Sequence, residues 1–102
     1  MRVAKVIGTV TLNRSVPSFA QATLKLAVPQ SLANLSGAED SQADTIVVWD
    51  ELGAGVESLI AMSEGGEAAQ PFRPALKPVD AYNAALLDTV SLKTEARRAS
   101  EV

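Results

Sequence analysis

Apolar and polar residues alternate with a period of two in several short segments of the chain. In residues 2–12 (RVAKVIGTVTL), positions 4, 6, 10 and 12 are apolar and share one parity. Residues 23–28 (TLKLAV) alternate in the same way, and residues 45–49 (TIVVW) form a continuous apolar run. Alternation and β-branched residues are typical of β-strands, and a continuous short run is typical of a strand buried on both faces. Residues 56–63 (VESLIAMS) form a further predicted strand.

The segments between these strands carry turn signals. Gly8 in the middle of the first strand predicts a bulge. The sequence Leu52-Gly53-Ala54-Gly55 predicts a tight turn, and therefore a hairpin between the strands that flank it. Residues 30–44 and 64–78 are polar or rich in Pro and Gly, which predicts connecting loops, the second with room for a short helical turn.

The last part of the chain combines helix and strand signals. Asp80 is a candidate N-cap for a short helix over residues 81–85, and residues 89–92 (TVSL) favour a final strand. The total is five short strands and one short α-helix. The fold class we predict is therefore mainly β, a small OB-like barrel over residues 1–92, with a charged tail over residues 93–102.

Composition narrows the possible chemistry. The 102 residues are enough for one domain, and they include no Cys and no His. The absence of both excludes disulfides, thiolate metal sites, and catalytic triads or dyads that need His. No apolar run approaches the ~20 residues that span a membrane, and no apolar stretch follows the N-terminal charges as in a secretory signal. We therefore expect a cytoplasmic protein with no membrane partner.

The remaining candidate sites are weak. The candidate metal-binding clusters are Asp50 with Glu51 and Glu64 with Glu67. We interpret them as ordinary surface carboxylates, because a hard cation needs several oxygens that converge on one point. The Gly-rich segments at residues 53–55 and 63–67 lack the rest of a dinucleotide or phosphate-binding motif. Four aromatic residues and a purely acidic middle of the chain disfavour nucleic acid as a partner. We predict no catalytic residue, no metal and no cofactor.

Charge is strongly segregated along the chain. Residues 1–25 carry +4 and no acid, residues 26–72 carry −8 and no base, and residues 73–102 carry +1. Solvated faces would explain this pattern. A self-complementary, head-to-tail interface between copies of the chain would explain it as well.

Four segments in order carry a family resemblance. They are residues 6–10 (VIGTV), 50–56 (DELGAGV), 63–69 (SEGGEAA) and 78–81 (PVDA) running through Asp88. With this order and spacing, residues 1–92 resemble the vertex proteins of bacterial microcompartments, the EutN/CcmL family of shell proteins. The resemblance implies an OB-like barrel that assembles as a homopentamer and caps the vertices of a shell built mainly of hexameric shell proteins. It also implies a structural role, supplying curvature and closing the shell, and a location in that shell in the cytoplasm.

The resemblance sharpens two site predictions. A ring of five needs a heterologous interface, so we expect a basic edge of one subunit to face acids of residues 39–67 on its neighbour. The candidates are the bases Arg2, Lys5, Arg14 and Lys25 and the acids Asp50, Glu51, Glu64 and Glu67. Gly53, Ala54 and Gly55 are candidates for lining the five-fold axis, since small residues let backbones approach closely. Two alternatives remain: a free-standing OB-like binding module for a small ligand or partner protein, and a small enzyme subunit.

Overall fold

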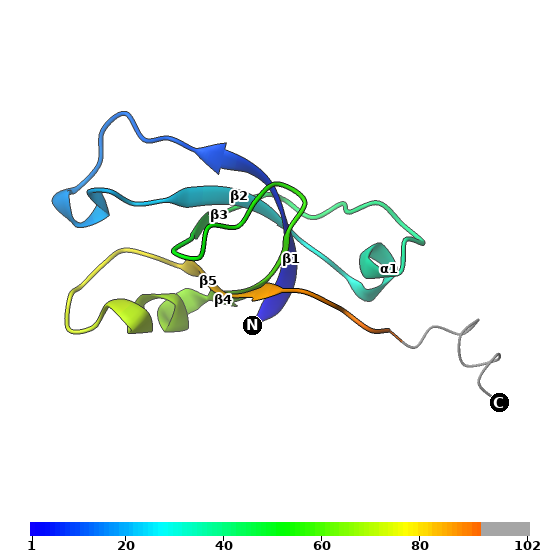
Figure 1. Ribbon diagram of the computed structural model, residues 1–102. Coiled ribbons are helices and arrows are strands. Elements are labelled where there is room, and N and C mark those ends of the chain that lie inside the picture. The colour runs from blue at the N-terminus through cyan, green and yellow to red at the C-terminus, as the bar shows by residue number, and fades with distance from the viewer. Residues whose placement is uncertain (93–102) are drawn as a thin grey trace.

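The computed structural model describes residues 1–92 and is built around five β-strands (Figure 1). The strands are β1 (Arg2–Val10), β2 (Leu24–Pro29), β3 (Ile46–Trp49), β4 (Leu59–Glu64) and β5 (Ala81–Leu87). The helical elements are short: α1 (Leu32–Leu35) and the 3-10 segments η1 (Pro17–Phe19) and η2 (Gly65–Phe72). The predicted tail over residues 93–102 lies outside the described residues, so the division at residue 92 stays a prediction.

The five strands form a closed barrel in the order β1-β2-β3-β5-β4. All neighbouring strands are antiparallel except β3 and β5, which are parallel and meet at the single pair Trp49 and Tyr82. The register of β1 against β2 shifts between Val6 and Gly8, which confirms the predicted irregularity at Gly8. The predicted fold class, a small five-stranded barrel, is confirmed.

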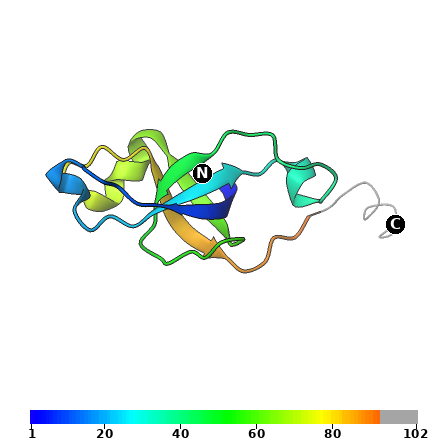
Figure 2. The same cartoon turned by 90° about the horizontal axis from the view of Figure 1, so that it is seen from above.

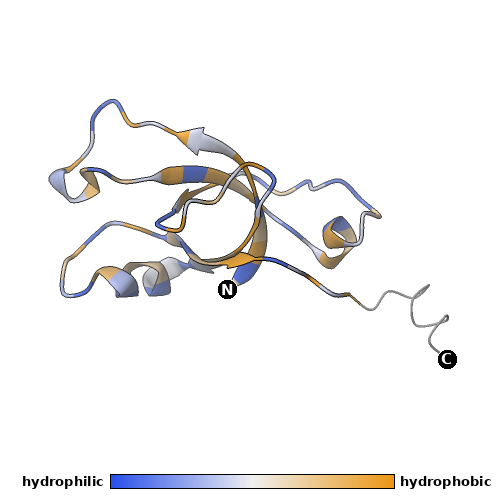
Figure 3. Ribbon diagram, viewed as in Figure 1, coloured by the Kyte–Doolittle hydropathy of each residue, from blue (hydrophilic) through white to orange (hydrophobic). Residues whose placement is uncertain are grey.

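The barrel interior is filled by small and medium-sized apolar side chains. Val6, Val48, Ile60 and Met62 are almost fully buried, with alanines between them. In Figure 3 hydrophobic residues are prominent along the barrel strands, while the connecting loops alternate between hydrophobic and hydrophilic residues. The alternating parity predicted for β1 places Ala4 and Val6 inside, and Ile7 on the outer wall.

The prediction of a helix over residues 81–85 is wrong, because these residues form most of β5. Alanine-rich sequence favours a helix in isolation, but six residues of β5 pair with β4 and bury Ala81 and Asn83 in the barrel wall. Tertiary pairing overrides local propensity here. The predicted strand over residues 89–92 is also wrong, since the final strand ends at Leu87.

The predicted hairpin between β3 and β4 is wrong as well. β3 pairs with β2 and β5, and β4 pairs with β1 and β5, so the segment between β3 and β4 crosses an end of the barrel instead of making a tight turn. Helix α1 lies in the predicted polar connection, where Ser31 and Asn34 form a capping box. The short helical turn anticipated in residues 64–78 is η2.

Two groups of loops extend from opposite ends of the barrel. Both views place η1, η2 and the loop after η2 at one end, and α1 with the segment that follows it at the other (Figures 1 and 2). The molecule therefore has two distinct ends, separated by the barrel.

Candidate functional site

The segment between β3 and β4, residues 50–58, is organised by one buried carboxylate. Asp50 is 1% exposed and accepts hydrogen bonds from three donors. The amide of Ala54 donates to Oδ2 at 2.7 Å, and the amide of Leu52 donates to Oδ1 at 3.0 Å. Asn83 on β5, also 1% exposed, donates its Nδ2 to Oδ1 at 2.9 Å. Asp50 thus ties the turn to β5, the strand that lies beside β3 in the barrel.

Opposing effects set the ionisation of Asp50. Desolvation raises the pKa of this carboxyl, while the bonds from Asn83, Leu52 and Ala54 and the charge of Lys25 lower it. The lowering effects prevail together, so the pKa of Asp50 lies below its ordinary value. A buried carboxylate that accepts three hydrogen bonds stabilises the conformation of the turn, because it satisfies backbone amides that would otherwise lack partners.

The burial of Asp50 and Ala54 contradicts the roles that the sequence predicted for them at the subunit interface and at the five-fold axis. Asp50 is enclosed within its own subunit and is not available for an ion pair with a neighbour. The side chain of Ala54 is 2% exposed and belongs to the hydrophobic core, so it is not available to line an opening. Gly53, which has a φ of +75°, and Gly55 are exposed, and their predicted place at the five-fold axis stays a prediction.

Two bases of the predicted basic edge, Arg2 and Lys5, form ion pairs with acids of the same chain. Arg2 donates Nε and Nη2 to the two carboxylate oxygens of Glu64, at 2.8 and 2.6 Å. These bonds lower the pKa of Glu64 and raise that of Arg2. Lys5 lies 3.0 Å from the carboxylate of Glu57. The structure therefore brings the β1 bases next to one acid of β4 and one acid of the segment before β4, although the sequence pattern had separated these charges.

The other predicted interface residues differ in their surroundings. The hydroxyl of Tyr82 donates to Glu51 at 2.6 Å; this bond, burial and the nearby carboxylates of Glu51 and Asp50 raise the pKa of Tyr82 to about 12. Within residues 1–92, five of the eight predicted charges have no ion-pair partner: Arg14, Lys25, Asp50, Glu51 and Glu67.

An aromatic cluster at one end of the barrel was not anticipated as a unit. Trp49 packs edge-on against Phe19 and Phe72, with ring centroids 5.2 and 4.8 Å apart, and Phe72 packs against Tyr82 at 5.5 Å. Lys77 lies over the rings of Trp49 and Phe72 at 5.0 and 5.3 Å, and donates Nζ to the carbonyl of Ser18 at 2.6 Å. Lys77 therefore ties the loop after η2 to the loop of η1. Its position in a Pro-rich loop gave no sequence signal for this contact.

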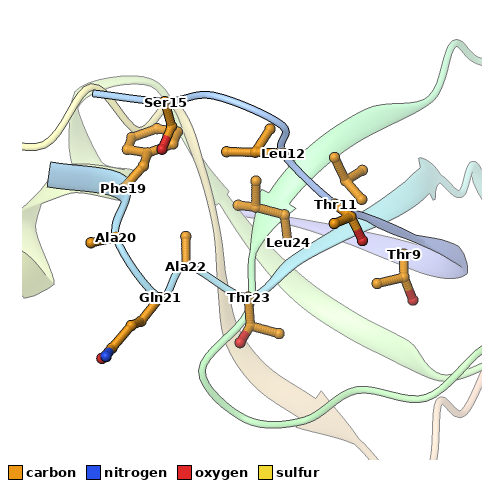
Figure 4. A pocket seen from close by; sticks show the side chains of 11 residues that line it. Thr9, Thr11, Leu12, Ser15, Phe19, Ala20, Gln21, Ala22, Thr23 and Leu24 are labelled. Atoms are coloured by element: carbon orange, nitrogen blue, oxygen red, sulfur yellow. The ribbon is translucent and has the colours of Figure 1, made fainter. Parts of the chain in front are cut away.

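The hollow beside η1 offers little chemistry. It has a volume of about 390 Å³ and lies between the end of β1 and the start of β2, with Leu12, Phe19 and Leu24 among its lining residues (Figure 4). None of the residues that line it is an acid, a base or a tyrosine. In the part of the chain that the structure describes, no three acidic side chains gather as a metal site would require. No helix within residues 1–92 is long and apolar enough to cross a membrane.

Comparison with known proteins identifies the family. The family model described as ethanolamine utilisation protein EutN/carboxysome matches residues 1–88. This chain belongs to the EutN/CcmL family. It is 33% identical over 96 residues to the carboxysome shell vertex protein CcmL of Synechococcus elongatus, a match that spans 94% of this chain and 92% of the relative. It is also 33% identical to CcmL of Thermosynechococcus vestitus, over 89% of this chain and 87% of that protein.

Solved structures of the EutN/CcmL family share the barrel. CcmL of Gloeobacter violaceus superposes with a TM-score of 0.78 at 28% identity, over 90% of both chains. The pentameric microcompartment shell protein GrpN of Rhodospirillum rubrum superposes with a TM-score of 0.75 at 27% identity, over 91% of this chain and 100% of its own. The matches thus extend over the barrel and the loops at both of its ends.

Proposed function

We propose that this protein forms a ring of five identical subunits that closes a vertex of a bacterial microcompartment shell. The observation that carries the proposal is the match along nearly the whole chain to GrpN, a pentameric microcompartment shell protein, and to CcmL vertex proteins. Its role is structural: a sheet of hexagonal tiles is flat, and closure of a polyhedron requires five-fold points. The partners on its outer edges are then hexameric shell proteins, and the role requires no catalytic step.

The mass of the assembly in solution tests this function. Native mass spectrometry or light scattering of the full chain is expected to give about five times its 10.7 kDa. A mass of one chain would instead favour the free-standing OB-like binding module, and would contradict the ring. Addition of the pentamer to hexameric shell protein from the same compartment is expected to convert open sheets into closed shells in electron micrographs.

The ring interface is heterologous in this proposal, with a basic edge of one subunit against acids of the next. Arg2 and Lys5 already have carboxylate partners in their own chain. Arg14 and Lys25 remain the basic members of that edge without an ion pair in residues 1–92, and Glu67 is an acidic one. Exposed ion pairs of this kind steer association more than they stabilise it.

The same ring places Gly53 and Gly55 around its axis in our proposal. Gly55 is suited to a test, because a Cβ there meets only Ser58 Oγ at 3.8 Å, an ordinary contact, and its φ is not positive. Gly55→Trp is expected to narrow the central opening in electron micrographs while the pentamer mass is kept. Gly66→Trp is the matched control, since a Cβ at Gly66 meets nothing within 4 Å. An unchanged opening in Gly55→Trp would contradict the assignment.

A further inference from the structure

The loop after η2 presents a rigid, basic and apolar tip. Leu76 is 89% exposed, and Arg73 is exposed beside it without an ion-pair partner in the described part of the chain. No acidic residue lies between positions 68 and 79. A large exposed aliphatic side chain on a well-anchored loop is a candidate contact for a partner.

Both sides of this tip are anchored. Phe72 packs between Trp49 and Tyr82, and Lys77 is bound to the Ser18 carbonyl and covers two aromatic rings. The amide of Ala75 donates to the carbonyl of Phe72 at 2.8 Å, which closes the turn between them. A segment that is already ordered loses little conformational freedom when it binds. The tip, residues 73–76, therefore has the properties of a preformed docking element.

The opposite end of the molecule carries a groove of complementary character. A cavity of about 250 Å³ lies between the segment after α1 and the outer surface of β1 and β2. Glu39 and Asp40 stand at this groove, and Ile7, which is 43% exposed, contributes an apolar surface. Neither acid has an ion-pair partner in residues 1–92, and Lys5, the one base in the lining, is paired with Glu57.

The walls of the groove are also ordered. Asn34 donates Nδ2 to the carbonyl of Glu39 at 3.2 Å, and Ser41 donates its hydroxyl to the carbonyl of Pro29 at 3.2 Å. A second hollow of about 380 Å³ adjoins this one and shares five lining residues with it: Gln30, Asn34, Glu39, Asp40 and Ala43. The two acids therefore face a surface wide enough for the loop tip of another subunit.

We propose that the tip of one subunit, residues 73–76, docks into the acidic groove of the next, with Arg73 facing Glu39 and Asp40 and Leu76 against Ile7. The inference rests on the proposed ring. A cyclic assembly requires two different, mutually complementary surfaces on each subunit. The tip and the groove are complementary in charge and both apolar in part, and they lie at opposite ends of the molecule (Figures 1 and 2). They therefore cannot satisfy one another within one chain.

Crosslinking of the full-length assembly tests the contact, and the absence of natural cysteines makes the experiment clean. The double variant Asp40→Cys/Leu76→Cys, treated with a short bis-maleimide reagent, is expected to give a ladder of covalent species that extends to five chains. Each single variant is expected to give no ladder. Asp40→Cys/Leu86→Cys is the matched control, since Leu86 is also exposed, at 48%, but lies on β5 and outside the tip.

The outcomes separate this contact from the ring itself. A pentamer by mass that gives no ladder overturns the tip-and-groove contact and leaves the proposed function standing. A ladder only with another shell protein, or dimers of Leu76→Cys alone, likewise overturns it. A wild-type chain that is monomeric removes the proposed function and this contact together.

Charge reversal gives a second measurement that does not depend on crosslinking. Arg73→Glu and Asp40→Arg are each expected to raise the protein concentration at which half of the pentamer dissociates. The combination Arg73→Glu/Asp40→Arg is expected to bring that concentration back toward the wild-type value. All of these substitutions are at exposed positions, so the fold of the subunit is preserved. A combination that is no better than the single variants contradicts the contact.

Discussion

Asp50 and Glu64 show how differently two carboxylates act in one small barrel. Both accept short hydrogen bonds and both have a pKa below the ordinary value. Asp50 is 1% exposed and joins a turn to β5, whereas the side chain of Glu64 is 33% exposed and bridges β1 and β4 at the surface. Water replaces a lost partner at Glu64 but not at Asp50. Burial, rather than the number of bonds, should decide what each carboxylate contributes.

The largest loss of folding stability is expected when Asp50 is replaced. Asp50→Asn keeps the shape but places an amide group where three donors converge, so at least one donor is left buried without an acceptor. We expect the free energy of unfolding to fall by about 3 kcal/mol, measured by the midpoint of urea unfolding at unchanged slope. Asp44→Asn, at an exposed position, is the control. Equal midpoints for the two variants would remove the distinction between buried and exposed carboxylates.

Lys77 is half-buried and should give an intermediate effect. Lys77→Met keeps most of the aliphatic stem but loses the bond to the Ser18 carbonyl and the contact of the charge with two rings. We expect a loss of about 1–2 kcal/mol and faster hydrogen exchange in the η1 loop. Unchanged exchange at η1 in Lys77→Met would show that the loops are held by their rings alone.

A smaller effect is expected at the Arg2–Glu64 pair. A double-mutant cycle with Arg2→Gln and Glu64→Gln should give a coupling of about 0.5 kcal/mol at low salt, and less at high salt. The measurement is the urea midpoint of the four proteins at two salt concentrations. A coupling as large as the loss in Asp50→Asn would mean that exposure does not weaken this pair.

The smallest expected effect is the change in the free energy of unfolding with pH. Because the pKa values of Asp50 and Glu64 lie below their ordinary values of 3.8 and 4.5, the folded chain binds fewer protons than the unfolded chain in acid. The free energy of unfolding should therefore fall as the pH drops from about 4.5 through the lowered pKa values. Glu64→Gln and Asp50→Asn should each flatten this dependence, which urea unfolding at several pH values measures. A dependence that is unchanged in Asp50→Asn would show that this carboxyl titrates alike in both states.

Much of the fold could be predicted from alternation in the sequence, and the failures have local causes. β1 and β2 lie where period-two alternation predicts them, and β3 and β4 overlap the predicted strands at residues 45–49 and 56–63. The prediction that β3 is buried on both faces is wrong, since Val47 is 45% exposed. The segment of β5 was mistaken for a helix because its alanines and leucines suit either structure, and only pairing with β4 decides between them. The hairpin after β3 was wrong for a similar reason, since turn residues indicate a change of direction but not the partner strand.

The candidate site was less predictable. Asp50 follows directly on a buried strand and precedes a Gly-rich turn, a place where aspartate often bonds to nearby amides, so a signal for its pinning role was present. Asn83 and Lys77 had none, because their partners are distant in sequence. Segregation of charge predicts complementary surfaces on neighbouring subunits, and this stays a prediction. The pattern could not show that Arg2 and Lys5 find acids within their own chain.

Only one residue pair joins β3 to β5, and this affects how the barrel closes between these two strands. At this seam Trp49 and Tyr82 face each other, and their rings continue into Phe19 and Phe72. Closure there depends on the fit of aromatic surfaces more than on a ladder of backbone bonds. The bond from Asn83 to Asp50 joins the same two strands just beyond this pair, so aromatic packing and one buried carboxylate together hold this part of the barrel wall.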